Sequence, residues 1–305
     1  MCRSEDEFNA TPPVNASTPA NSADLTSPVS DERVFKLIVA YDGTKYCGWQ
    51  RQPVQPTVQK AVELALGKVL GQPRWPVRAT SRTDTGVHAL GQVVVFRSSL
   101  WRAPAERLAP AMNTVLPSDI VVRSACEVAA DFNPHAQCSG KRYRYRVYAS
   151  RIADPLDGRF HWWVKRKLNI EAMQAAANLL LGKHDFVAFE TNGSPRQCTI
   201  RTVRAIEIQS RQYLDGQQID FEIEADGFLY NMVRNIVGTL VVVGRERRPP
   251  SWVLEVLSSK DRREAGQTAQ PQGLHLLEVY FAEPSPVTRG NEIVLNSAAL
   301  DIEVE

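Results

Sequence analysis

The sequence predicts a mixed α/β fold built from two similar subdomains with a cleft between them. Both halves of the chain contain strand-like and helix-like segments in mixed order, rather than a long run of one type. The strand-like segments are short and apolar or alternating, and they end at turn residues. The helix-like segments carry apolar residues on one face and begin at residues that can cap a helix. We expect an N-terminal subdomain over residues 33–135 and a C-terminal subdomain over residues 136–282.

The first half is predicted to contain four strands and two helices. Residues 35–41 form an apolar strand that Asp42-Gly43 stops. Thr57 can cap a helix whose apolar face runs from Val58 to Val69 and which ends at Gly71. The remaining expected elements are strands at 77–80, 91–97 and 120–128 and a helix at 103–112.

The second half repeats this scheme loosely. Asn169 can cap a helix that runs to Leu181 and ends at Gly182. Residues 232–243 are apolar nearly all round, which predicts a buried helix. Asp215-Gly216 is a hairpin signal between two strands. The remaining expected elements are strands at 141–149, 202–209, 217–225 and 274–281 and a short helix that begins at residues 249–251.

Charge is distributed unevenly along the chain. The net charge is +2, yet residues 1–32 carry −5 and residues 283–305 carry −4, so +11 remains on residues 33–282. The N-terminal segment is rich in Ser, Thr, Pro, Asn and Ala, which predicts a disordered acidic tail. The C-terminal segment is predicted to be a second loose tail. A compact body with this excess of positive charge attracts polyanions, above all nucleic acid.

Composition also argues against several classes of protein. The longest apolar runs fall short of the roughly 20 residues that cross a bilayer, and no hydrophobic signal core is apparent. Five cysteines without a C-x-x-C pair fit a reducing cytoplasm. Five scattered histidines without an H-E-x-x-H motif make a protein-bound metal unexpected.

The segment Ser81-Arg82-Thr83-Asp84-Thr85-Gly86-Val87-His88-Ala89 lies between two predicted strands. It holds an aspartate and an arginine on a short glycine-containing loop at a sheet edge, where functional groups are often placed. The alternative is an ordinary tight turn, because Asp-Thr-Gly suits a reversal of the chain.

Several motifs together resemble the tRNA pseudouridine synthase A family, over about residues 34–281. The loop from Arg82 to Ala89, followed by Gly91-Gln92-Val93, is similar to the active-site loop of that family. The other matching segments follow in the order found in the family: Tyr41-Asp42-Gly43-Thr44-x-Tyr46-x-Gly48-Trp49-Gln50, Lys141-Arg142-Tyr143-Arg144-Tyr145, Met232-Val233-Arg234-Asn235-Ile236-Val237-Gly238 and Gly273-Leu274-x-Leu276.

The resemblance implies one long, mostly antiparallel mixed sheet with a central basic cleft. It also implies a tRNA-uridine isomerase that forms pseudouridine at positions 38, 39 and 40 of the anticodon arm. Asp84 would be the catalytic carboxylate, acting as a nucleophile or as a base that removes a sugar proton; the sequence leaves both routes open. Arg82 would fill the gap left by the extruded base and favour ionised Asp84. Tyr143 would stack on the flipped base, and the leucine matching Leu274 packs against it.

The same resemblance implies no cofactor and no metal, tRNA as the partner, a homodimer without membrane attachment, and action in the cytoplasm. Two loops match RNA-contacting segments of the family by position, Phe132-Asn133-Pro134-His135-Ala136 and Gly193-Ser194-Pro195-Arg196-Gln197. His135 departs from the pattern, since arginine is common there and histidine is mostly uncharged at neutral pH. Ser81 and Thr85 replace the usual Gly and Ala and could add a hydrogen bond to the loop.

Several side chains have more than one interpretation. Arg142, Arg144 and Arg146 could form a solvated strand face, but in a body of +11 we expect some of them to contact phosphate. Arg234 lies on an apolar helix and is costly to bury unpaired, so we expect it to pair with a carboxylate such as Asp84, in a structural or a catalytic role. His88 is expected to be structural.

Two rival functions compete with the isomerase. Asp84-Thr85-Gly86 is the signature of aspartic proteases, but a single-chain enzyme of that class needs a second such motif, which the sequence lacks. A non-catalytic basic RNA-binding protein would explain the charge but would give no reason for Asp84.

Overall fold

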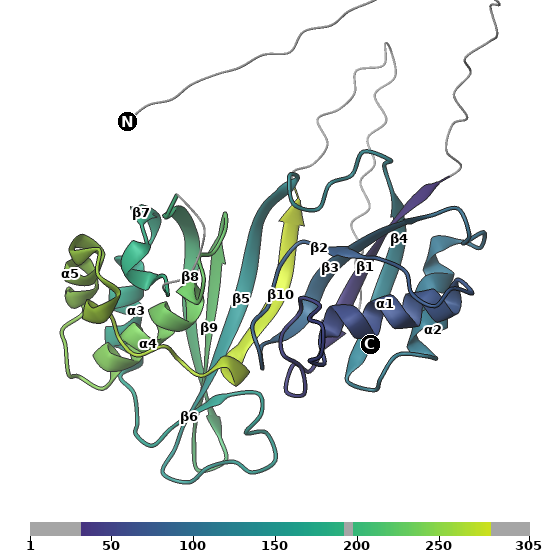
Figure 1. Cartoon of the computed structure of the whole chain (residues 1–305). Helices are drawn as coiled ribbons and strands as arrows, with labels where there is room; N and C mark the ends of the chain where they lie inside the picture. Colours follow the sequence, from purple (N-terminus) through teal and green to yellow (C-terminus); the bar gives the residue numbers. More distant parts are fainter. Residues whose placement is uncertain (1–31, 192–197, 282–305) are drawn as a thin grey trace, which may run out of the picture. The chain divides into compact units, whose positions relative to one another are not determined.

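A ten-stranded sheet organises the part of the chain that this computed structural model describes, which comprises residues 32–191 and 198–281. The main path of the sheet runs β4-β1-β3-β10-β5-β9-β8-β7, with β2 paired to β3 and β6 paired to β5. Neighbours are antiparallel except for the pairs β3–β10 and β5–β6. The mixed α/β class and the mostly antiparallel sheet are thus confirmed, and the sheet is continuous through both halves of the chain (Figure 1).

The strands have the following bounds: β1 (Arg33–Tyr41), β2 (Arg78–Ala79), β3 (His88–Ser98), β4 (Ile120–Val128), β5 (Cys138–Ala149), β6 (Trp162–Val164), β7 (Gly182–Asp185), β8 (Ile200–Tyr213), β9 (Gly216–Ala225) and β10 (Leu274–Phe281). The helices have the following bounds: α1 (Val58–Val69), α2 (Leu108–Asn113), α3 (Ile170–Asn178), α4 (Met232–Gly244) and α5 (Trp252–Ser259).

The helices pack on one face of the sheet. In β1, buried and half-exposed residues alternate, with Leu37, Val39 and Tyr41 facing the helices. In β5 the side chains of Tyr143 and Tyr145 are buried in the same core. Figure 1 shows α1 and α2 against the strands of the N-terminal half and α3, α4 and α5 against those of the C-terminal half. The alternation along each strand therefore leaves the opposite face of the sheet to charged and half-exposed side chains.

Capping chemistry sets the starts of two helices as predicted. The Thr57 side chain accepts a hydrogen bond from the backbone N–H of Lys60 (3.4 Å), and the Asn169 side chain accepts one from that of Ala172 (3.0 Å). The predicted end of α3 is wrong, because the regular helix stops at Asn178. Gly182 does not cap the helix; with a positive φ of 94° it begins the edge strand β7.

The arginines of β5 lie on the open face and pair with carboxylates on β9. Arg146 donates to both oxygens of Asp220 (2.8 and 3.1 Å), and the Nε of Arg144 donates to Glu222 (3.0 Å). Arg142 donates to Glu278 of β10 (3.1 Å). Cross-strand register places these opposite charges side by side. This face is therefore an ion-pair ladder, which favours the solvated-face interpretation over phosphate contact.

The two predicted tails lie outside the described residues, apart from Glu32. The subdomain boundary near residue 135 stays a prediction. Among the helices of the described residues, none has the length and apolar character that a membrane span requires.

Candidate active site

The loop from Thr80 to Val87 joins β2 to β3 and is held by the segment that follows β1. The Trp49 backbone N–H donates to the Thr83 carbonyl (3.0 Å), and the Gly86 N–H donates to the Tyr46 carbonyl (3.4 Å). From β3, the Gln92 side chain donates to the Ser81 carbonyl (2.8 Å). Backbone hydrogen bonds at both ends therefore fix the main chain on either side of Asp84.

Glycine permits a close approach between these two segments. A Cβ built on Gly48 would lie 2.5 Å from the Thr83 carbonyl oxygen, and the backbone of Gly48 has a φ of +80°. A Cβ on Gly43 would lie 2.0 Å from the Val87 carbonyl oxygen. Side chains at these positions would displace the loop, which gives a physical reason for glycines in the segment after β1.

Asp84 is half-buried at the centre of this loop. Burial raises the pKa of its carboxyl above the ordinary value, while the positive charge of Arg234 acts in the opposite direction. The expectation that Arg82 supplies this charge is wrong: the Arg82 side chain is exposed, and the cation that acts on Asp84 comes from α4. Sequence proximity suggested Arg82, but the charge of this exposed side chain acts on His135 instead.

Arg234 is held in place from both sides of its guanidinium. Its Nε donates to the Ala269 carbonyl (2.7 Å), and another nitrogen donates to the Asn231 side chain (2.6 Å). Burial lowers the pKa of Arg234, and the negative charge of Asp84 is among the influences that raise it again. The expected pairing with Asp84 is thus a charge interaction through space, while the direct contacts of Arg234 are with neutral oxygens.

An aromatic pair lies on the same side of the sheet as the loop. Tyr143 on β5 is 8% exposed, and its ring meets that of Phe228 edge-on at 5.0 Å. Tyr41 on β1 shares a hydrogen bond of 2.7 Å with the hydroxyl of Thr83, next to Asp84. Burial raises the pKa of Tyr41, and the nearby Tyr143 raises it further, so the two phenols are close neighbours. Tyr41 is a site residue that sequence analysis missed, although it begins one of the motifs quoted above.

Leu274 is the first residue of β10, and it is buried beside Tyr145 in the register of the sheet. The preceding short 3-10 turn lies against the loop that holds Asp84, because a Cβ on Gly86 would lie 3.4 Å from the ring of Pro271. The structure therefore brings Asp84, Tyr143, Arg234 and the start of β10 to one region from four separate parts of the sequence.

His88 has a structural environment. Its Nδ1 accepts from the Gly43 backbone N–H (3.0 Å), and its Nε2 lies 2.9 Å from the Arg159 carbonyl. This pattern fits a neutral ring with its proton on Nε2, and burial lowers the pKa of His88 below its ordinary value. His88 therefore anchors the end of the loop that holds Asp84, and its ring stacks on that of His275.

One of the two predicted RNA-contacting loops is described. Phe132 packs on Phe281, and the Asn133 side chain accepts from the backbone of His135 and of Ala136, which makes a tight turn around the buried Pro134. Burial lowers the pKa of His135, and the positive charges of Lys141, Arg82 and Arg78 lower it further. The loop thus lies beside Arg82 in a basic environment. The second loop, 193–197, falls outside the described residues.

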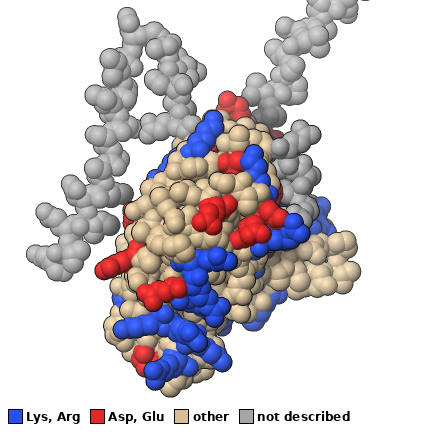
Figure 2. Space-filling view, turned by 90° about the vertical axis from the view of Figure 1, so that its left-hand side faces the viewer, with Lys and Arg blue, Asp and Glu red and all other residues tan. Residues whose placement is uncertain are grey.

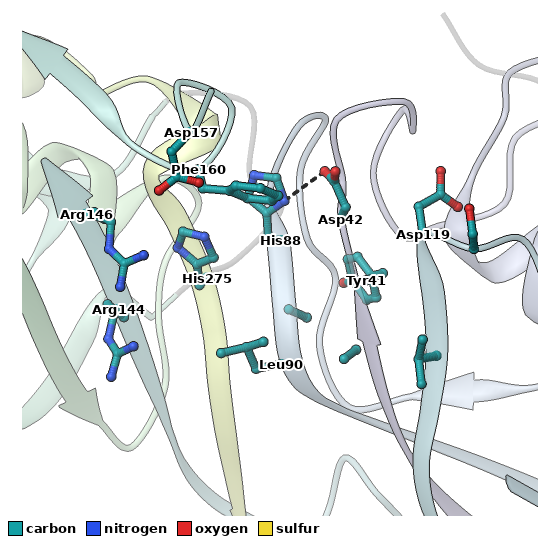
Figure 3. Close-up of a pocket in the computed structure, with 14 residues that line it drawn as sticks. Tyr41, Asp42, His88, Leu90, Asp119, Arg144, Arg146, Asp157, Phe160 and His275 are labelled. Atoms are coloured by element: carbon teal, nitrogen blue, oxygen red, sulfur yellow. Dashed lines mark ion pairs between the residues drawn. The ribbon is translucent and has the colours of Figure 1, made fainter. Parts of the chain in front are cut away.

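A pocket of about 420 Å³ lies on the face of the sheet that carries Arg144 and Arg146 (Figure 3). Its lining includes His88, His275, Phe160, Arg144 and Arg146, and it does not include Asp84. Of the segment that the sequence singles out, His88 and Ala89 line the pocket, as does Tyr41, so the pocket lies against the end of this segment rather than at Asp84.

Positive charge also gathers at the C-terminal half of the molecule. Figure 2 shows Lys and Arg side chains concentrated over the lower part of the side on which α3 and α5 lie. Burial lowers the pKa of Arg245, and Arg247 and Arg166 lower it further, so these three cations are close together. Such a group favours contact with a polyanion.

Comparison with known proteins agrees with this arrangement. The family model described as tRNA pseudouridine synthase matches residues 37–135 and 176–282. A tRNA pseudouridine synthase A of Myxococcus xanthus is 45% identical over 252 residues, which cover 83% of this chain and 93% of the relative. One from Thermoanaerobacter sp. (strain X514) is 45% identical and one from Acetivibrio thermocellus is 42% identical, each over 82% of this chain and 100% of the relative.

The matched family model and the names of these relatives identify the chain as an enzyme of the isomerase class. The chain belongs to the tRNA pseudouridine synthase family, and the resemblance seen in the sequence is confirmed.

Proposed function

We propose that this protein converts uridine to pseudouridine in tRNA, at positions 38, 39 and 40 of the anticodon stem-loop, with Asp84 as the catalytic carboxylate. The observation that carries the proposal is the fixed placement of Asp84, half-buried between hydrogen-bonded segments and within the field of Arg234. The names of the relatives support tRNA as the substrate.

The environment of Asp84 suits a group that attacks or removes a proton. Burial makes its carboxylate more basic than a solvated one, and the positive charge of Arg234 offsets part of this effect by stabilising the ionised form. Both routes, attack by the carboxylate and removal of a sugar proton, use this ionised oxygen. The reaction breaks the bond from ribose to the ring nitrogen, rotates the base and rejoins it through carbon.

A base that reacts at its glycosidic bond must first leave the helical stack. In the proposed complex, Arg82 enters the gap left in the RNA and Tyr143 stacks on the extruded uracil, with Leu274 packed against it. The exposure of Arg82 and the position of Tyr143 in the same region as Asp84 support these roles. Base stacking on an aromatic ring is worth about 1–3 kcal/mol.

Phosphate contacts are assigned to the loop Phe132–Ala136, beside Arg82, and to the loop Gly193–Gln197. The net charge of +11 on residues 33–282 supports binding to a polyanion such as tRNA. We propose that the enzyme acts as a homodimer in the cytoplasm, with one tRNA contacting both protomers.

Mapping of the product tests the proposed substrate. Incubation with unmodified tRNA transcripts that carry uridine at positions 38, 39 or 40 is expected to yield pseudouridine at those positions, detected by carbodiimide-dependent stops of reverse transcription. Transcripts with cytidine at all three positions should give no product. Pseudouridine elsewhere in the tRNA, with none in the anticodon arm, would contradict the assigned positions.

The pH dependence of the reaction is expected to move when Arg234 loses its charge. Arg234 lowers the pKa of Asp84, so Arg234→Gln should raise that pKa further. Because the ionised carboxylate is the active form, activity is lost as pH falls through this pKa, and the acid limb of kcat/KM should shift to higher pH. Arg234→Lys retains a positive charge and should keep the limb near its wild-type position. An unshifted limb in Arg234→Gln would show that this arginine does not act on the catalytic group.

A further inference from the structure

Three potential metal ligands meet in the loop between β5 and β6. A carboxylate oxygen of Asp154, one of Asp157 and a ring nitrogen of His161 lie within 4.8 Å of one another. Asp154 is 5% exposed and His161 is 2% exposed, so this is not one of the solvated acidic groups that are common on protein surfaces. The D-x-x-D-x-x-x-H spacing of the cluster belongs to an irregular loop, so no motif in the sequence indicated it.

The buried imidazole of His161 lacks a hydrogen-bonding partner. Its Nε2 is fully buried, and it forms no hydrogen bond with any of the described residues. Leaving such a polar atom unsatisfied in the interior costs about 1–3 kcal/mol. An imidazole that is not protonated carries a lone pair on one of its two ring nitrogens. A neutral imidazole with this geometry is suited to coordinate a cation.

The two aspartates have different positions in the loop. Asp154 accepts the backbone N–H groups of Leu156 (2.9 Å) and Asp157 (3.3 Å) on one oxygen, while its other oxygen accepts only the Tyr213 hydroxyl (3.1 Å). That second oxygen keeps a lone pair. Within the described part of the chain, no hydrogen bond or ion pair engages the Asp157 carboxylate, although it is half-buried.

Charge at the cluster favours a cation. The positive charge of Arg146 acts on His161, but Asp220 on β9 neutralises this arginine through two hydrogen bonds. Two carboxylates and a neutral imidazole therefore meet with a local charge near −2. Among the described residues, neither aspartate forms a hydrogen bond or an ion pair with His161. The three potential ligands therefore lie close together without bonding to one another.

We propose that Asp154, Asp157 and His161 bind a divalent transition-metal cation that fixes the loop between β5 and β6. Two carboxylate oxygens and one imidazole nitrogen suit ions such as Mn²⁺, with water completing the coordination. Metal–ligand bonds of about 2.1 Å bring donor atoms to roughly 3–4 Å from one another, so a contraction of about 1 Å would close the site. The role is structural, because Asp84 lies in a different loop.

The loop connects this site to the supports of the catalytic loop. Phe160, next to His161, packs its ring on that of His88 at 5.0 Å, and the Arg159 carbonyl lies 2.9 Å from His88 Nε2. Figure 3 shows Asp157 beside Phe160 at the edge of the open-face pocket. A cation at the cluster would therefore stabilise the segment that holds His88 in place.

Titration of the full chain with Mn²⁺ tests this site in the absence of RNA. The protein is first treated with EDTA and desalted, and free Mn²⁺ is then followed by electron paramagnetic resonance. Mn²⁺ is preferred to Zn²⁺ as the probe because the free thiols, such as Cys126, bind soft cations. We expect saturable binding of one ion per chain and a rise in the melting temperature.

Two variants and two matched controls decide the outcome. His161→Gln and Asp157→Asn should each weaken Mn²⁺ binding by at least about 10–100-fold. Asp157→Asn breaks no side-chain hydrogen bond among the described residues, so it should remain folded. His184→Gln and Asp131→Asn make the same chemical changes elsewhere, at β7 and at an exposed residue after β4, and should bind Mn²⁺ like the wild type. The proposal would be overturned if folded wild-type protein did not bind Mn²⁺ at millimolar concentration. It would also be overturned if Asp157→Asn and His161→Gln bound Mn²⁺ as tightly as the wild type.

Discussion

Replacement of Asp84 by asparagine is expected to reduce pseudouridine formation by at least about 10⁴-fold while leaving tRNA binding intact. The change keeps the size of the side chain but removes the ionised oxygen on which both chemical routes depend, and losses of this size follow removal of a catalytic nucleophile or base. Affinity should be retained because polyanion binding relies on the positive charge of the body rather than on this carboxylate. Single-turnover conversion of tRNA and filter binding measure the two quantities separately.

Glu255→Gln provides the control for this variant. Glu255 is an exposed residue of α5. Its replacement by glutamine also changes a carboxylate to an amide, but away from the loop. Wild-type conversion is expected for this control. Full activity of Asp84→Asn would refute the catalytic role of the carboxylate and would favour a function limited to RNA binding.

The sequence predicts the strands and helices that carry a strong pattern. The apolar run of α4 is long enough to identify a buried helix, and Thr57 and Asn169 cap helices where capping chemistry places them. The strands β6 and β7 have three and four residues. They are too short to show a period, and β7 is largely polar because it lies at the edge of the sheet.

Part of the site can be predicted from the energetic cost of burying a charge, and part can be found only in the folded structure. The cost of burying Arg234 unpaired predicted a carboxylate within its reach, and its charge does act on Asp84. Sequence neighbours misled in the case of Arg82, since two positions along a loop do not determine where a side chain points. The partners of the β5 arginines depend on the register between β5 and β9, which a single strand does not encode.

The supporting role of the segment after β1 likewise emerges only in three dimensions. The motif that begins at Tyr41 contains glycines for which the sequence alone offers no purpose beyond a turn. In the structure, Gly48 lies against the carbonyl of Thr83, and Tyr41 binds the hydroxyl of the same residue. The motif that begins at Tyr41 and the loop that holds Asp84 are separate in the sequence, but they form one structural unit in the folded protein.

Substitution of Gly48 by alanine is therefore expected to lower kcat by about 10²-fold, although position 48 carries no reactive group. The added Cβ would lie 2.5 Å from the Thr83 carbonyl oxygen, which is backbone and cannot rotate away. The loop must shift, and misplacement of a reacting group by about 1 Å costs rate on this scale.

Gly71→Ala is the matched control: its φ of +67° imposes similar backbone strain, but its Cβ meets nothing within 4 Å. Urea unfolding should show a larger loss of stability in Gly48→Ala, because of the clash with Thr83, so kcat is compared under conditions in which both variants are folded; a selective loss of kcat in Gly48→Ala then reports the displacement of Asp84. Equal activity in the two variants would show that the contact between these segments does not position the carboxylate.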